Sequence, residues 1–264
     1  MKIIVLIKQV PDTAQLSSTV DGLKLMAAGS ARIVNPFDEY AIETALQLKE
    51  AHGGQVTALT VGQPEAVEAL KTALAMGADE AILISDPALV NGDSLTTARV
   101  LAAAITKIGG YDLIVAGRSA VDGNTWATAV QVAALLDIPQ ISYVAKLKTV
   151  DPAGRAITAV RLMEGGRETV SSRLPALVSV VKEINEPRYP SFIGIRRAAK
   201  ATIPTWSVAD VGLAADQVGA TGSQVRWPEL NLPATREAKV EIITGSPADA
   251  AKVLADKLAA EKII

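Results

Sequence analysis

The chain has 264 residues, 49% of them hydrophobic, with 26 basic and 28 acidic side chains, and this composition predicts a globular protein. The near-neutral charge lacks the basic excess that broad nucleic-acid binding requires, and the absence of cysteine rules out disulfides, cysteine-ligated metal sites and thiol nucleophiles. No apolar run approaches the roughly 20 residues that cross a bilayer, so we expect no membrane insertion and a location in a cytoplasm or an organelle matrix.

Short apolar runs alternate with longer segments whose apolar residues recur at helical spacing. The runs are 3–7, 56–61, 81–85, 113–116 and 141–147, and the helical segments are 38–52, 64–76, 93–108 and 122–136. This alternation predicts βαβ units and an α/β fold with a doubly wound, mostly parallel sheet. Asp38, Asp93 and Asp122 are the expected N-caps, and Gly77 is an expected helix end.

The only histidine, His52, precedes two glycines that are typical of a helix end. A positive side chain there interacts favourably with the helix dipole, which favours a helix-terminal residue over a catalytic base. We therefore expect neither a catalytic residue nor a metal site in this chain.

The alternation stops after Pro139. Two extended runs flank the turn signal at 151–154 and predict an added hairpin over about 144–172. Residues 183–204 carry three prolines and no clean period, which is typical of a long functional loop. We place these in one domain, 1–204, and assign 205–264 to a C-terminal arm with a closing helix at 247–260, which has to lie against the main domain or another subunit.

Ligands of open parallel sheets bind at the carboxyl ends of the strands, where the strand order reverses. One segment expected there, 117–125, has small residues whose amides can approach a phosphate, followed by an expected helix N-terminus. The alternative is that Asp122 and Asn124 only cap that helix. Asn35, which precedes a proline, fits either a contact to a base or ribose, or an ordinary turn. No dinucleotide fingerprint, phosphate-binding P-loop or nucleophile elbow is present, which argues against common dehydrogenases and ATPases.

A second segment, 185–200, holds two of the nine aromatic residues of the chain. Phe192 and Ile193 beside Arg196, Arg197 and Lys200 have the composition of a protein-docking element. The alternative is that Phe192 packs into the core while the cations are solvated, and composition alone slightly favours it.

Several blocks in order give the chain a resemblance over essentially its whole length. They are RLMEGGRE at 161–168 with Leu174-Pro175-Ala176, NEPRYPSF at 185–192, VNPFDEYAIETALQLK at 34–49 and ALAMGADEA at 73–81. With them the chain resembles the small (beta) subunit of the electron transfer flavoproteins. The resemblance implies a fold like that of the adenine-nucleotide alpha hydrolases. It also implies a heterodimer whose alpha subunit holds the redox-active FAD, while this chain binds an adenine nucleotide.

The resemblance also implies which residues bind the nucleotide. They are Leu6, Lys8, Asn35, Phe37, Asp38, Val61, Gly117, Arg118, Ser119, Ala120, Val121, Asp122, Gly123, Asn124, Thr125, Trp126, Ala127 and Thr128. It implies docking of acyl-CoA or similar flavin dehydrogenases, as in fatty acid oxidation, with electrons passing on to a quinone oxidoreductase or a similar acceptor. The docking residues are Asn185, Glu186, Pro187, Arg188, Tyr189, Pro190, Ser191, Phe192, Ile193, Arg196, Arg197 and Lys200, with Phe192 where the family usually has a leucine.

The family divides on the identity of the nucleotide. Ordinary members resemble one another in holding AMP, with a threonine at the place of Thr128, whereas electron-bifurcating members that oxidise NADH hold a second FAD and usually read DGDTAQVGP. Here 122–125 is close to the first half of that motif, but 126–130 departs from the second. These residues favour AMP, with the bifurcating type as the alternative. A stand-alone adenine-nucleotide sensor is a third alternative, which would not need the segments after 140.

Overall fold

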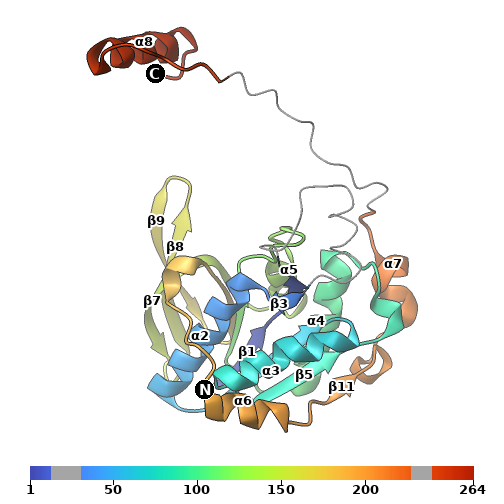
Figure 1. Cartoon of the computed structure of the whole chain (residues 1–264). Helices are drawn as coiled ribbons and strands as arrows, with labels where there is room; N and C mark the ends of the chain where they lie inside the picture. Colours follow the sequence, from blue (N-terminus) through green and yellow to red (C-terminus); the bar gives the residue numbers. More distant parts are fainter. Residues whose placement is uncertain (13–30, 227–239) are drawn as a thin grey trace. The chain divides into compact units, whose positions relative to one another are not determined.

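The computed structural model describes residues 1–12, 31–226 and 240–264. It separates into two units, Met1–Leu230 and Asn231–Ile264 (Figure 1). Among the described residues, no helix is long and apolar enough to cross a membrane.

A nine-stranded sheet forms the centre of the first unit (Figure 1). Its order is β11 (Thr205–Trp206), β5 (Glu80–Ile84), β4 (Gln55–Val61), β1 (Lys2–Leu6), β6 (Leu113–Gly117), β10 (Ala176–Val180), β7 (Gln140–Asp151), β8 (Ala156–Met163) and β9 (Gly166–Arg173). The pairs from β11 to β7 are parallel, and those joining β7, β8 and β9 are antiparallel. Strands β2 (Gln9–Pro11) and β3 (Arg32–Val34) form a separate antiparallel pair.

Helices cover both faces of the parallel part of the sheet. Alternate residues of each strand point to opposite faces, so strands that are apolar throughout need helices packed on both sides. Ile3 and Val5 of β1 pack with helices α2 (Pro36–His52) and α3 (Val67–Met76) on one face. Ile4 and Leu6 pack with α4 (Ser94–Ile108) and α5 (Thr128–Leu135) on the other. The predicted doubly wound α/β fold is therefore confirmed.

Two of the four predicted helix-end signals are confirmed and two are wrong. The Asp93 side chain accepts a hydrogen bond from Thr96 N at 2.8 Å and caps α4, and Gly77 follows the last residue of α3 with a φ of 136°. Asp38, however, lies inside the first turn of α2, which begins at Pro36. Asp122 does not cap α5, because that helix begins only at Thr128 and the Asp122 carboxylate is paired with a lysine instead.

The region after Pro139 is more regular than predicted. The predicted run at 141–147 and the first strand of the predicted hairpin are one strand, β7, which pairs with β10 on one side and β8 on the other. The predicted hairpin has a third strand, β9, which no apolar alternation marked because its sequence, GRETVSSR, is almost entirely polar. The predicted loop at 183–204 contains the eight-residue helix α6 (Phe192–Ala199), whose start is capped by the Ser191 hydroxyl.

Residues 205–226 lie with the sheet rather than apart from it. Strand β11 pairs with β5, and the chain continues through two 3-10 turns, Ala209–Val211 and Ala215–Gln217, to the short helix α7 (Gly219–Gly222). The first unit thus extends past the predicted division at 204–205, and residues 227–239 of the predicted arm lie outside the described residues. In the second unit, the predicted closing helix is α8 (Pro247–Ala260), none of whose residues is buried.

Candidate functional site

Three strands end side by side at the topological switch point. From β1 the chain moves outward through β4 to β5 and then returns to β6 on the other side of β1. Leu6, the last residue of β1, pairs with Leu59 of β4 and Ala116 of β6. The carboxyl ends of β1, β4 and β6 therefore meet where open α/β sheets bind ligands, as the sequence predicted.

The buried carboxylate of Asp38 joins these strand ends to α2. Asp38 Oδ2 accepts a hydrogen bond from Lys8 N at 2.7 Å. Burial raises the pKa of Asp38 from 3.8 to about 7, and its polar interactions with Asn35, Lys8 and Gly117 offset only part of the increase. Asp38 thus has a structural role, because it joins the first turn of α2 to the chain that follows β1.

The raised pKa of Asp38 predicts a pH-dependent stability. Below pH 4 the carboxyl is protonated in both folded and unfolded chains and costs nothing; between pH 4 and 7 only the unfolded chain loses its proton. The Asp38 contribution should therefore lower the unfolding free energy as pH rises through this window, by on the order of 4 kcal/mol. We expect the difference in unfolding free energy between wild type and Asp38→Asn to change with pH from 4 to 7. A difference that is flat over this range would contradict the assignment.

Asn35 holds the loop that follows β6. Its side chain is fully buried; Asn35 Nδ2 donates to Ser119 O at 2.8 Å, and Asn35 Oδ1 accepts from Val121 N at 3.1 Å. Its backbone amide also donates to Lys8 O at 2.8 Å. Asn35 is the N-cap residue of α2, as the turn interpretation predicts, but its side chain makes no capping hydrogen bond and instead positions the loop 118–127. The contact to a base or ribose stays a prediction.

Arg118, the first residue of this loop, lies between two aromatic rings. Its guanidinium carbon is 4.3 Å from the ring centroid of Phe37 and 4.5 Å from that of Trp126. The Trp126 ring in turn packs against Tyr143 of β7, with centroids 5.5 Å apart. Arg118 Nε is buried without a hydrogen-bond partner in the described part of the chain, so this cationic group retains a donor at the site.

The rest of the loop is fixed by polar contacts. Lys8 Nζ binds both carboxylate oxygens of Asp122, at 2.7 and 2.8 Å. Ser119 Oγ donates to Asn124 Oδ1 at 3.2 Å, and Asn124 N donates to Ala120 O at 2.8 Å. Because Asp122 is paired with Lys8, Asn124 binds Ser119 and Ala120, and α5 begins only at Thr128, the alternative that Asp122 and Asn124 cap this helix is wrong.

The first turn of α5 offers further polar groups. Thr128 opens the helix, and the preceding residue, Ala127, supplies no side-chain cap. Gln131 lies three residues later on the same side of the helix, and its Oε1 atom is buried with no partner among the described residues. Gln131 and Tyr143 were not among the residues predicted from the sequence. The helical spacing from Thr128 could have found Gln131, but nothing in the sequence places Tyr143 against Trp126.

The segment 185–200, which we call the docking segment, exposes large apolar side chains. Tyr189 is 95% exposed, Phe192 74% and Ile193 79%. The expectation from composition that Phe192 packs into the core is wrong. Other predicted docking residues point inward: Asn185 Nδ2 donates to Thr44 Oγ1, and Arg197 Nη2 donates to Leu74 O.

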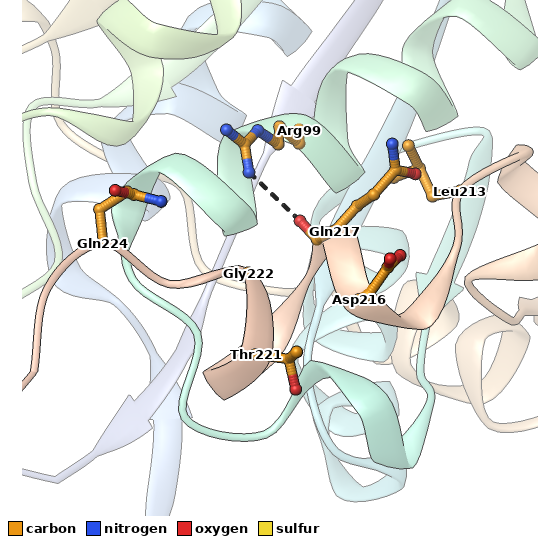
Figure 2. A pocket seen from close by; sticks show the side chains of 7 residues that line it. All are labelled: Arg99, Leu213, Asp216, Gln217, Thr221, Gly222 and Gln224. Atoms are coloured by element: carbon orange, nitrogen blue, oxygen red, sulfur yellow. Dashed lines mark hydrogen bonds between the residues drawn. The ribbon is translucent and has the colours of Figure 1, made fainter.

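A surface pocket of about 430 Å³ shares no residue with either region (Figure 2). It is lined by Arg99, Leu213, Asp216, Gln217, Thr221, Gly222 and Gln224. Among the lining residues, Arg99 Nη1 donates a hydrogen bond to Gln217 O at 3.3 Å, which connects α4 to the 3-10 turn 215–217 (Figure 2). No residue predicted from the sequence lies in it.

The chain matches a known protein family over most of its length. A model of the electron transfer flavoprotein domain matches residues 22–211. The chain belongs to the electron transfer flavoprotein family. An electron transfer flavoprotein subunit beta from Thermoanaerobacterium thermosaccharolyticum is 38% identical over 265 residues, all of both chains, which confirms the resemblance to the beta subunit.

Two further relatives of this electron transfer flavoprotein beta subunit carry other names. Protein FixA of Azorhizobium caulinodans is 38% identical over 258 residues, 95% of this chain and 92% of the relative. The caffeyl-CoA reductase-Etf complex subunit CarD of Acetobacterium woodii is 39% identical over 267 residues and matches along the full length of both chains.

Proposed function

We propose that this chain is the small subunit of a heterodimeric electron carrier. Its alpha subunit holds the redox-active FAD, and this chain holds an AMP at the ends of β1, β4 and β6. The observation that carries the proposal is the loop 118–127, fixed by Asn35 and Lys8 beside these strand ends. Full-length likeness to a subunit named beta favours this function over a stand-alone sensor.

The residues present fit an adenine nucleotide. Arg118 and Gln131 each have a buried polar atom without a partner in the described chain, so the site has both a donor and an acceptor to offer. The start of α5 at Thr128 favours a phosphate, because its free amides and the helix dipole attract an anion. In this proposal Arg118, Thr125 and Thr128 hold the phosphate, and Gln131 is an additional contact.

The residues at 126–130 favour AMP over a second FAD. They read WATAV and lack the QVGP half of the motif of FAD-holding members, while Thr128 stands where AMP-holding members have a threonine. The Trp126 ring also fills the space between Arg118 and Tyr143. A smaller residue, as in the FAD-type motif, would leave that space open.

A second candidate function is that of a bifurcating subunit, with a second FAD that oxidises NADH. It is favoured by the sequence DGNT at 122–125 and by the full-length likeness to the CarD subunit of a caffeyl-CoA reductase-Etf complex. In either case the flavins supply the electron chemistry, and this chain positions them and their partners.

The docking segment is proposed to bind flavin dehydrogenases such as acyl-CoA dehydrogenases, from which electrons pass through the alpha-subunit FAD to a quinone oxidoreductase or a similar acceptor. Exposed Tyr189, Phe192 and Ile193 support this role, as does Arg196, whose guanidinium lies 6.0 Å from the Phe192 ring, because aromatic anchors surrounded by charge dominate protein interfaces.

Counting the bound nucleotides tests the proposed function. The chain is purified with its alpha partner, the complex is denatured, and the released nucleotides are identified by chromatography. We expect one FAD and one AMP per heterodimer. Two FAD and no AMP would establish the bifurcating alternative, and a chain that purifies without a flavin-containing partner would contradict both.

A further inference from the structure

The exposed side chains of the docking segment are carried by backbone that is tied down at several points. At its start, Asn185 Nδ2 donates to Tyr40 O at 3.1 Å and to Thr44 Oγ1 at 2.8 Å, both on α2. Near its end, Arg197 Nη2 donates to Leu74 O at 2.9 Å and to Ala78 O at 3.2 Å, at the end of α3. The segment is thus anchored on two helices of the first unit.

Arg188 makes the most extensive of these attachments. Its guanidinium binds two carboxylates of α2: Arg188 Nε and Nη2 donate to Glu43 at 2.7 and 3.0 Å, and Nη1 and Nη2 donate to Glu50. The Arg188 backbone amide donates to Glu43 Oε2 as well, at 3.2 Å. Glu43 therefore fixes both the side chain and the backbone of Arg188.

Glu43 is a buried partner of Arg188 and not an incidental surface contact. Its side chain is only 5% exposed. Burial alone would raise the pKa of Glu43, but hydrogen bonds from Arg188 and Gln47 outweigh it, and the net pKa lies below its usual value. The carboxylate is therefore charged at neutral pH, and it is too buried to touch a partner protein itself.

The position of Arg188 connects this clamp to the exposed surface. Tyr189 is the next residue, and Phe192 begins helix α6 four residues after Arg188. Ordering a flexible loop on binding costs affinity, whereas a loop already held in its bound form avoids that cost. A clamp directly beside the exposed aromatic residues is well placed to preorganise them.

We infer that Arg188 is a positioning residue for dehydrogenase docking, acting through its ion pairs with Glu43 and Glu50 of α2. This inference rests on the proposed docking function. Arg188 is not required to contact the dehydrogenase; it holds Tyr189 and Phe192 in the orientation that the dehydrogenase meets.

The test uses the complete heterodimer as electron acceptor of a flavin dehydrogenase that reduces the wild-type complex, beginning with an acyl-CoA dehydrogenase and its acyl-CoA. Arg188→Ala should raise the KM for the heterodimer about tenfold with kcat unchanged, because the surface must be re-ordered at each encounter. Glu43→Gln should raise the KM similarly, although its side chain is buried, and combining the two should add little. Arg188→Lys, which retains a charge but cannot span two carboxylates, should lie between.

Hydrogen exchange on the same heterodimers supplies the structural readout. Arg188→Ala and the milder, exposed-partner variant Glu50→Gln should both increase amide exchange within 186–192 while leaving the sheet protected. Lys71→Ala is the control, since it breaks a comparably exposed ion pair with Glu68 that lies within α3. It should leave both KM and exchange unchanged.

The outcomes separate the inference from the function on which it rests. If Phe192→Ala raises the KM but Arg188→Ala and Glu43→Gln do not, the docking surface stands and the positioning role is wrong. If Arg188→Ala raises the KM and Glu43→Gln does not, Arg188 contacts the dehydrogenase directly, which also overturns the inference. If Phe192→Ala has no effect, the proposed docking function itself fails. Unchanged exchange at 186–192 in Arg188→Ala would refute the clamp independently of any dehydrogenase.

Discussion

Replacing Gly117 with alanine is expected to abolish binding of the proposed nucleotide and to lower the unfolding free energy by about 3 kcal/mol. Gly117 is the last residue of β6, and a Cβ atom there would overlap Asp38 Oδ1 and lie 2.7 Å from the backbone carbon of Phe37. Neither neighbour can move freely, because Asp38 is held by the amide of Lys8 and Phe37 is in the first turn of α2. The added methyl group therefore has to push α2 away from the strand ends.

Gly165→Ala is the control for this change. It lies in the turn between β8 and β9, outside the predicted nucleotide contacts, and a Cβ atom there meets nothing within 4 Å. We expect its unfolding free energy to stay within about 0.5 kcal/mol of wild type, with full nucleotide retention. Both variants are measured by denaturant unfolding and by chromatography of the released nucleotide. Equal behaviour of the two variants would show that the junction of β6 and α2 does not shape the site.

Phe192→Ala is expected to weaken docking of the dehydrogenase by about 2 kcal/mol, which corresponds to a roughly 30-fold higher KM for the heterodimer. The ring is 74% exposed at the start of α6, and Arg196 lies 6.0 Å from its centroid. Because the ring contributes little to the core, the unfolding free energy should change by less than about 0.5 kcal/mol. Steady-state kinetics with varied heterodimer concentration measure the effect.

Val90→Ala provides the comparison for Phe192→Ala. Val90 is also an exposed apolar residue, 44% accessible, but it follows the 3-10 turn Pro87–Leu89 and is not part of the docking segment. Its removal should leave the KM unchanged. A KM for Phe192→Ala within twofold of wild type would reject the aromatic anchor.

The parallel core was predictable from the sequence because its strands are buried on both faces and its helices are amphipathic. Runs such as LIVAG at β6 permit few other structures. Strand β9 and helix α6 were not predictable in this way. The first is a polar strand that pairs beyond the edge of the core, and the second lies in a proline-rich segment whose apolar residues face outward.

The candidate site was predicted as a region, but the roles of its residues were not. The sequence placed Asn35 and Asp38 at the site as ligand contacts or caps, whereas the structure shows them binding backbone groups of the loop 118–127 and of the strand ends. Similarly, Arg188 was assigned to the docking segment, but its carboxylate partner is 145 residues away in the sequence. Such long-range pairings depend on the tertiary fold and leave no local pattern.

Helix α2 contacts both the strand ends and the docking segment, so the number of residues between its two contacts fixes the distance between these regions. Its first turn carries Asp38 beneath the strand ends, and Glu43, five residues later, clamps the docking segment. At a rise of about 1.5 Å per residue, these two attachments are separated by about 7.5 Å along a single rigid rod. One inserted residue between them would turn Glu43 about 100° around the helix axis, away from Arg188. A change in the residue count between Asp38 and Glu43 should therefore separate the attachment beneath the proposed nucleotide site from the attachment that holds the docking segment.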